Sequence, residues 1–118
     1  MNNSSKQREI LKRLDILTAQ YAEKLPSRLK EIRRSLDKLE DADSDHGDVL
    51  IEIHRLVHSL AGTSGTYGYV RVSKYLRGLE TYIDELTNSS SVSLGEDNIN
   101  RIEEELAAIE IAIDEVQV

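Results

Sequence analysis

Apolar residues recur at spacings of three and four along most of the chain, which is the periodicity of one face of an α-helix. The stripes are interrupted at Pro26, in two polar stretches and near Gly68, where helices are expected to begin or end. The pattern predicts a first helix over residues 5–24 and further helices over residues 26–40, 47–66, 70–87 and 96–116. Because no segment has a strand pattern, we expect an all-α fold.

These segments are expected to form a single domain over residues 1–118, an antiparallel four-helix bundle with an additional N-terminal helix. Proline is tolerated in the first turn of a helix but breaks a helix interior, so Pro26 divides the first two segments. The sequence leaves open whether they are two helices or one kinked helix. Asp45 or Asp48 is expected to cap the helix that follows, and Gly68 to end it.

Composition narrows the classes of function. The chain has no Phe and no Trp, so its core must be built from Leu, Ile, Val and Ala with a few tyrosines. The net charge of -7 argues against a nucleic-acid or membrane surface, and we interpret the basic residues between Lys24 and Arg34 as a solvated helix face. The absence of Cys excludes disulfides and thiolate chemistry. No apolar run reaches signal-peptide or membrane-spanning length, so we expect a cytoplasmic location.

The stretch HRLVHSLAGTSGTYGYV contains two histidines four residues apart, followed by three glycines at intervals of three. On a helix His54, His58, Gly62 and Gly65 share one face, beside the apolar stripe. Each glycine in a helix interior costs roughly 0.5–1 kcal/mol relative to alanine. Either another helix packs closely on the glycines, or a partner must reach His58 without obstruction. The alignment of the glycines with the histidines favours an accessible His58.

Three other chemistries fit this stretch less well. A histidine pair at this spacing can bind zinc, but a zinc protease has glutamate where this chain has Arg55, so we expect no metal site. The run GTSGTYG lacks the lysine of a phosphate-binding loop and follows no strand. Ser59 and Ser64 could belong to a catalytic triad, but nothing suggests an oxyanion site. The remaining interpretation is His58 as a nucleophile, because a neutral imidazole near pH 7 can attack phosphorus.

At these residues the chain resembles the histidine phosphotransfer (HPt) domains of bacterial multistep phosphorelays. In that family the phosphorylated histidine precedes x-Leu-Lys/Ala-Gly, with small residues and a further glycine beyond. The stretch HSLAGTSGTYG has this pattern through His58, Leu60, Ala61, Gly62, Gly65 and Gly68. The following YLRGLE is similar to a stretch of the family's next helix. The resemblance implies a four-helix bundle with an N-terminal helix packed on it, and a phosphoryl carrier that is not an enzyme by itself.

The resemblance also implies the partners. His58 would accept a phosphoryl group from the phosphoaspartate of a response-regulator receiver domain and pass it to another receiver, or back. The receiver would supply the magnesium, so the chain would need no cofactor of its own, and a sensor or hybrid histidine kinase would act upstream. A monomer suits a carrier that presents one face to successive partners. The alternative is a helical adaptor bundle without phosphate chemistry, which predicts a buried His58.

Supporting residues follow from the same resemblance. Many family members have lysine three residues after the histidine, where it can steady phosphoryl oxygens, but this chain has Ala61. One of three nearby basic residues could supply the charge instead, and Glu80 could border the site from the next helix. A bulky residue at Gly65 is expected to block docking while leaving the fold intact. The candidate supporting residues are Arg55, Ala61, Gly62, Gly65, Lys74, Arg77 and Glu80.

Overall fold

A computed structural model describes residues 2–41, 45–88 and 94–117. Its elements are α1 (Asn2–Asp37), the short 3-10 helix η1 (Lys38–Glu40), α2 (His46–Thr66), α3 (Val70–Thr87) and α4 (Glu96–Gln117). No strand occurs in the described ranges, so the all-α prediction is confirmed. The last three helices span nearly the same residues as the segments predicted from the apolar pattern.

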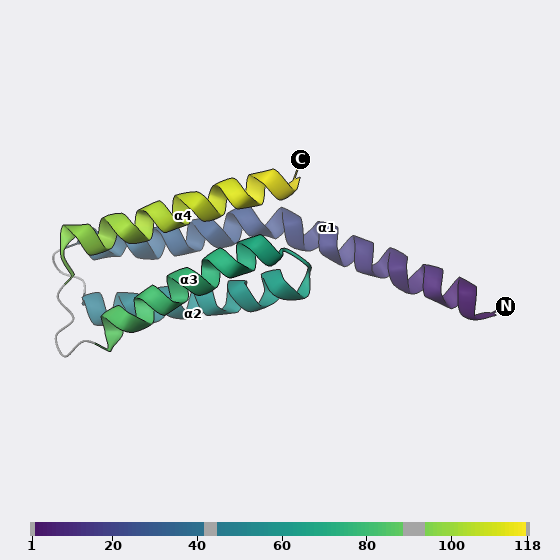
Figure 1. The fold of residues 1–118 in the computed structure, drawn as a ribbon, viewed down its shortest axis with the longest axis horizontal. Helices are drawn as coiled ribbons and strands as arrows, with labels where there is room; N and C mark the ends of the chain where they lie inside the picture. The colour runs from purple at the N-terminus through teal and green to yellow at the C-terminus, as the bar shows by residue number, and fades with distance from the viewer. Residues whose placement is uncertain (1, 42–44, 89–93, 118) are drawn as a thin grey trace.

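The four helices form a bundle in which α2 and α3 make an antiparallel hairpin beside α4 and the C-terminal half of α1 (Figure 1). The apolar stripes face inward, and burying each large aliphatic side chain contributes roughly 1.5–3 kcal/mol. The residues beside the stripes, including the histidines of α2, are therefore turned toward the rim of the bundle. The most deeply buried side chains include Leu25, Ile32, Leu50, Ile53, Leu76, Leu79, Ile83, Ile102, Leu106 and Ile109.

Two capping structures fix the ends of α2. Gly68 has a φ of 86°, the left-handed conformation that glycine adopts without strain. Its amide donates to the Gly65 carbonyl at 3.2 Å, and the Tyr69 amide donates to the Ser64 carbonyl at 2.8 Å. These two bonds form a Schellman motif, so Gly68 ends the helix as predicted. At the other end Asp45 accepts hydrogen bonds from two backbone amides, at 2.8 and 3.3 Å, and is the N-cap.

Helix α1 differs from the two segments predicted on either side of Pro26. Residues 5–24 and most of residues 26–40 belong to one helix that runs through the proline and continues into η1. A proline inside a helix costs about 3 kcal/mol or more. Leu25 is fully buried and Leu29 is 6% exposed, so packing against the bundle holds the helix together around Pro26.

The first part of α1 projects beyond the bundle (Figure 1). We call residues 2–20 the N-terminal extension; Tyr21 is the first residue of α1 that hydrogen-bonds to another helix, through Thr63 and Ser64. The bundle of four helices is confirmed. The prediction of an additional N-terminal helix packed on it is wrong, because this segment continues α1 away from the bundle.

Candidate functional site

His58 stands on the outer face of α2. Its side chain is 73% exposed, whereas Val57 and Leu60 on the same helix are buried in the core. Helical periodicity explains this arrangement, because the apolar stripe turns inward and the residues beside it turn outward. The imidazole can therefore be reached by another macromolecule.

One carboxylate orients the His58 ring. Nδ1 lies 2.8 Å from Oε1 and 2.9 Å from Oε2 of Glu80, whose side chain on α3 is only 17% exposed. An ionised carboxylate can only accept hydrogen bonds, so Nδ1 is the nitrogen that holds the hydrogen in the neutral ring. Nε2 then keeps its lone pair, and the hydrogen bonds of the described residues leave it without a partner.

A second histidine–carboxylate pair lies beside the first. Nε2 of His54 is 2.8 Å from Oδ1 of Asp84, and the His54 and His58 rings are stacked with centroids 6.1 Å apart. His54 thus engages the nitrogen that His58 leaves open, so the two rings are not equivalent. Sequence reasoning missed Asp84. The available signal was a pair of acidic residues four apart in the helix that follows the two histidines. Two antiparallel helices packed side by side can place residue pairs of equal spacing opposite each other.

The structure separates the two helical glycines that sequence analysis treated alike. A Cβ built on Gly62 would meet no atom within 4 Å, so this position faces open space. A Cβ on Gly65 would lie 3.3 Å from Oγ of Ser73, so here α3 packs closely on α2. Accessibility therefore explains Gly62, and helix packing explains Gly65. Gly65 is itself exposed, so a side chain there would be tight against Ser73 but could extend toward solvent, and the effect of a bulky residue on the fold stays a prediction.

Ala61 belongs to the same close contact between α2 and α3. Its side chain is 2% exposed, and its carbonyl accepts a hydrogen bond of 2.8 Å from Oγ of Ser73, which is also buried. Ala61 is therefore placed inside the hairpin and not on the surface around His58. The long side chain of a lysine at this position would have to extend out of the interface to reach a phosphoryl group.

The basic candidates lie on different sides of His58. Arg77 is one turn from Glu80 along α3, and its Nε lies 3.4 Å from Oγ of Ser73. Lys74 is exposed but lies about 120° around α3 from Glu80. Arg55 is exposed on α2, one turn before His58. Arg77 and Arg55 thus each lie one helical turn from a member of the His58–Glu80 pair, whereas Lys74 is turned away from Glu80.

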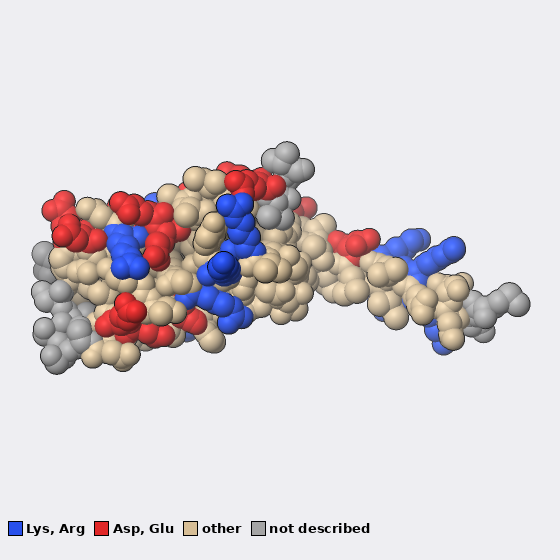
Figure 2. Space-filling view, viewed as in Figure 1, with Lys and Arg blue, Asp and Glu red and all other residues tan. Residues whose placement is uncertain are grey.

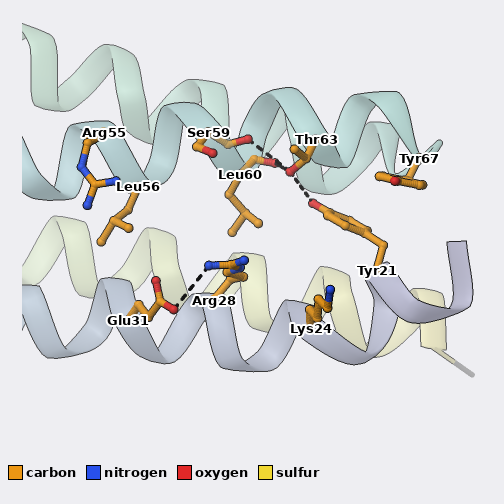
Figure 3. A pocket seen from close by; sticks show the side chains of 10 residues that line it. All are labelled: Tyr21, Lys24, Arg28, Glu31, Arg55, Leu56, Ser59, Leu60, Thr63 and Tyr67. Carbon is orange, nitrogen blue, oxygen red and sulfur yellow. Dashed lines mark hydrogen bonds and ion pairs between the residues drawn. The ribbon is translucent and has the colours of Figure 1, made fainter. Parts of the chain in front are cut away.

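A groove of about 370 Å³ runs between α1 and α2 (Figure 3). It lies on the side of α2 that faces α1, whereas His58 pairs with Glu80 on α3. Arg55 and Ser59 line it from α2, while Lys24 and Arg28 line it from α1. Tyr21 closes one end, where its ring stacks on that of Tyr67, the C-cap of α2, with centroids 4.6 Å apart. Sequence analysis interpreted Lys24 and Arg28 as part of a solvated helix face and did not associate them with Arg55. Only the packing of α1 on α2 places these three cations together.

Two features of the described residues bear on other functions. They contain no group of three or more His, Cys, Asp or Glu side chains placed to hold a metal ion. Within the described part of the chain, none of the helices combines the length and the apolar character that crossing a bilayer requires.

Comparison with known proteins identifies the family. A family model for the Hpt domain matches residues 17–112. No curated protein and no solved structure matches the chain significantly. The matched span includes α2 and α3 with both histidine–carboxylate pairs. Hpt domains are phosphotransfer modules of two-component signalling, and they carry phosphoryl groups rather than act as enzymes. Because the match covers most of its length, the chain belongs to the Hpt domain family.

Proposed function

We propose that His58 accepts a phosphoryl group from the phosphoaspartate of a receiver domain and passes it to another receiver, or back. The observation that carries this proposal is the exposure and orientation of the His58 ring. His58 is 73% exposed, Glu80 holds its Nδ1, and its Nε2 is open to an incoming group. Membership of the Hpt domain family supports the same chemistry.

The transfer step needs little from this chain beyond that ring. The Nε2 lone pair attacks phosphorus, an N–P bond forms, and the P–O bond to the aspartyl carboxylate breaks as the carboxylate leaves with the electron pair. The hydrogen on Nδ1 stays in place, so the ring becomes cationic while it carries the phosphoryl group. The carboxylate of Glu80, 2.8 Å from Nδ1, stabilises that positive charge. Transfer to a second receiver is the reverse of this step.

Two arginines suit the negative charge of the phosphoryl group. The pairs His54–Asp84, His58–Glu80 and Gly65–Ser73 define the register of the α2–α3 hairpin. In that register Arg77 lies across from Ala61, one residue before Gly62, whose missing side chain leaves room above the helix. Guanidinium groups form strong hydrogen bonds to phosphoryl oxygens, so Arg77, with Arg55 on the other side of the ring, takes the part of the lysine absent at Ala61.

The receiver brings the remaining components. Its aspartate site supplies the magnesium, so this chain needs no cofactor of its own, and a sensor or hybrid histidine kinase phosphorylates the first receiver. The groove lined by Lys24, Arg28 and Arg55 also contains Glu31, which pairs with Arg28, and it extends the surface of α2 available for docking. A receiver that presents carboxylates around its phosphorylation site complements these cations. Such a relay operates in the cytoplasm.

The test is transfer of labelled phosphate. A receiver domain phosphorylated on aspartate is mixed with the full chain and magnesium, and label is followed onto wild type, His58→Gln and His54→Gln. We expect acid-labile, base-stable label on wild type and on His54→Gln, and none on His58→Gln. His54→Gln is the matched control, because it changes the stacked neighbour in the same helix. Label that persists on His58→Gln would assign the chemistry to another residue.

The adaptor alternative makes the opposite prediction. A bundle that only binds partners would take no label from any phosphorylated receiver and would keep its partner binding in His58→Gln. It also has no use for an exposed imidazole with an oriented Nδ1, so the 73% exposure of the His58 side chain favours the carrier.

A further inference from the structure

The N-terminal extension has an uncovered apolar stripe. Ile10, Leu11, Leu14 and Leu17 are 58%, 60%, 51% and 45% exposed. Nine large hydrophobic side chains are exposed among the described residues, and five of these, the four above and Ile16, lie within residues 10–17. Scattered exposed apolar residues are normal on a protein surface, but a contiguous group on one side of a helix indicates an interaction site. Ile10, Leu11, Leu14 and Leu17 form such a group, whereas Ile16 lies on the opposite side of the helix.

This stripe is the continuation of an interface already present in the fold. Leu25 and Ile32, further along the same face of α1, are buried against the bundle, and Tyr21 marks the point of entry. The 36 residues of α1 extend about 54 Å, whereas the 22 residues of α4 extend about 33 Å. Helix α1 is thus longer than its partners, and its apolar face runs past the end of the helices that cover it (Figure 1).

The spacing of the stripe indicates that its partner is another helix. Ile10, Leu14, Leu17 and Tyr21 follow one another at intervals of four, three and four, the repeat of a helix-pairing seam. The extension has four basic residues and two acidic ones, a net charge of 4 − 2 = +2. Charges of both signs on the flanks are typical of paired helices, whereas a membrane-surface helix is more uniformly basic.

A second copy of this chain supplies a helix of the right length with the same seam. We propose that the N-terminal extensions of two copies pair antiparallel, giving a two-fold symmetric dimer with one bundle at each end. The fold excludes a parallel pair. In each copy the bundle packs on the same face of α1 that carries the apolar stripe, so two parallel extensions would force the two bundles to overlap. In the antiparallel pair the N-terminal extension of each copy covers the exposed apolar stripe on the extension of the other copy.

Charge favours the same arrangement. The first turns of the extension are basic, with Lys6 and Arg8. The bundle end that they approach in an antiparallel pair holds the last turns of α4, where acidic side chains lie beside basic ones (Figure 2). Glu115 there is paired with Arg71 at 2.7 Å, and Asp114 is exposed. Antiparallel pairing brings opposite charges together, whereas parallel pairing would place Lys6 and Arg8 of the two copies side by side. Because the seam ends near Tyr21, both His58 rings stay accessible.

The test is the mass of the full chain in solution over a range of concentrations. The extension is about 28 Å long, which is at the small end for a stable interface, so we expect a dimer that forms in the micromolar range. Sedimentation should show a rise from 13.3 kDa toward twice that mass. Leu14→Glu should weaken the dimer at least tenfold. Ile16→Glu adds the same charge about 200° away around the helix and should leave it unchanged.

Introduced cysteines test the orientation, because the natural chain has none. In an antiparallel pair Arg13→Cys, near the middle of the extension, should oxidise to a disulfide-linked dimer, whereas Asn3→Cys, near its end, should not. Rapid cross-linking of Asn3→Cys would overturn the antiparallel geometry. A wild-type chain that stays monomeric at every concentration would overturn the dimer, and Leu14-dependent binding to phosphatidylserine vesicles by that monomer would assign the stripe to a membrane. Phosphate labelling of Leu14→Glu should match wild type, so this test is independent of the one at His58.

Discussion

Replacement of Glu80 by glutamine separates the charge of that side chain from its hydrogen bond. The glutamine amide oxygen can still accept from Nδ1 of His58, so the ring should keep its orientation and its tautomer. What is lost is the negative charge that, in the proposed transfer, stabilises the ring once Nε2 holds the phosphoryl group. Glu80→Ala removes both the charge and the acceptor, so the two variants together divide the contribution of this residue.

The magnitude follows from the contact. Glu80 holds Nδ1 at 2.8 and 2.9 Å and is mostly buried, but the ring itself is 73% exposed. Hydrogen bonds to charged groups contribute about 1.5–3 kcal/mol. Because the ring is exposed to solvent, we expect the contribution of the Glu80 charge alone to lie at the lower end of this range. Since about 1.4 kcal/mol is tenfold in rate, Glu80→Gln should slow transfer about tenfold. Glu80→Ala should slow it about a hundredfold, because the tautomer is also released.

The assay has two readouts. Single-turnover transfer from a phosphorylated receiver gives the rate for wild type and both variants at one concentration of magnesium. The ¹⁵N chemical shifts of His58 report which ring nitrogen holds the hydrogen, a property that a merely structural role of Glu80 would not change. We expect wild-type-like shifts in Glu80→Gln and a mixture of tautomers in Glu80→Ala. Transfer by Glu80→Ala at the wild-type rate would refute the reasoning that this carboxylate prepares the ring.

The remaining predictions concern the glycines of α2 and one surface ion pair. Gly62→Ala should stabilise the fold by up to about 1 kcal/mol, because the added Cβ meets open space. Gly65→Ala should stabilise it less, because the added Cβ meets Ser73. Equal rises in Tm for the two variants would contradict this difference. Gly62→Gln should fold like wild type in circular dichroism yet slow transfer, and unimpaired transfer would show that the space above Gly62 is not needed for docking. The hydrogen bond from Lys38, at 3.2 Å, holds the pKa of Glu52 below its ordinary value, so this pair stabilises the fold above that ordinary pKa and the contribution is lost as pH falls through the lowered one. Lys38→Met should raise the pKa of Glu52 in an NMR titration, and no change would mean that the pair does not persist in solution.

Much of the fold was readable from local patterns. The bounds of α2, α3 and α4 follow from the apolar periodicity together with Asp45 and Gly68, because capping and termination depend on residues next to one another in the chain. The exposure of His58 was also predictable, since its position beside the stripe of α2 requires only the helical repeat. The sequence suggested Glu80 as a residue near the site but could not show that it contacts the His58 ring, because this contact depends on the register of the α2–α3 hairpin.

The sequence by itself determined which residues are helical, which faces are apolar, and which imidazole stands outside the core, since each of these depends on contacts within a few residues. Tertiary structure decided three other matters. It kept α1 continuous through Pro26, because burial of Leu25 and Leu29 outweighs the cost of the proline. It set α3 against Gly65 but not against Gly62, a difference between two glycines on one face that only the position of a second helix can make. It also assembled the groove lined by Lys24, Arg28 and Arg55 from α1 and α2, because cations distant in the sequence meet only when helices pack.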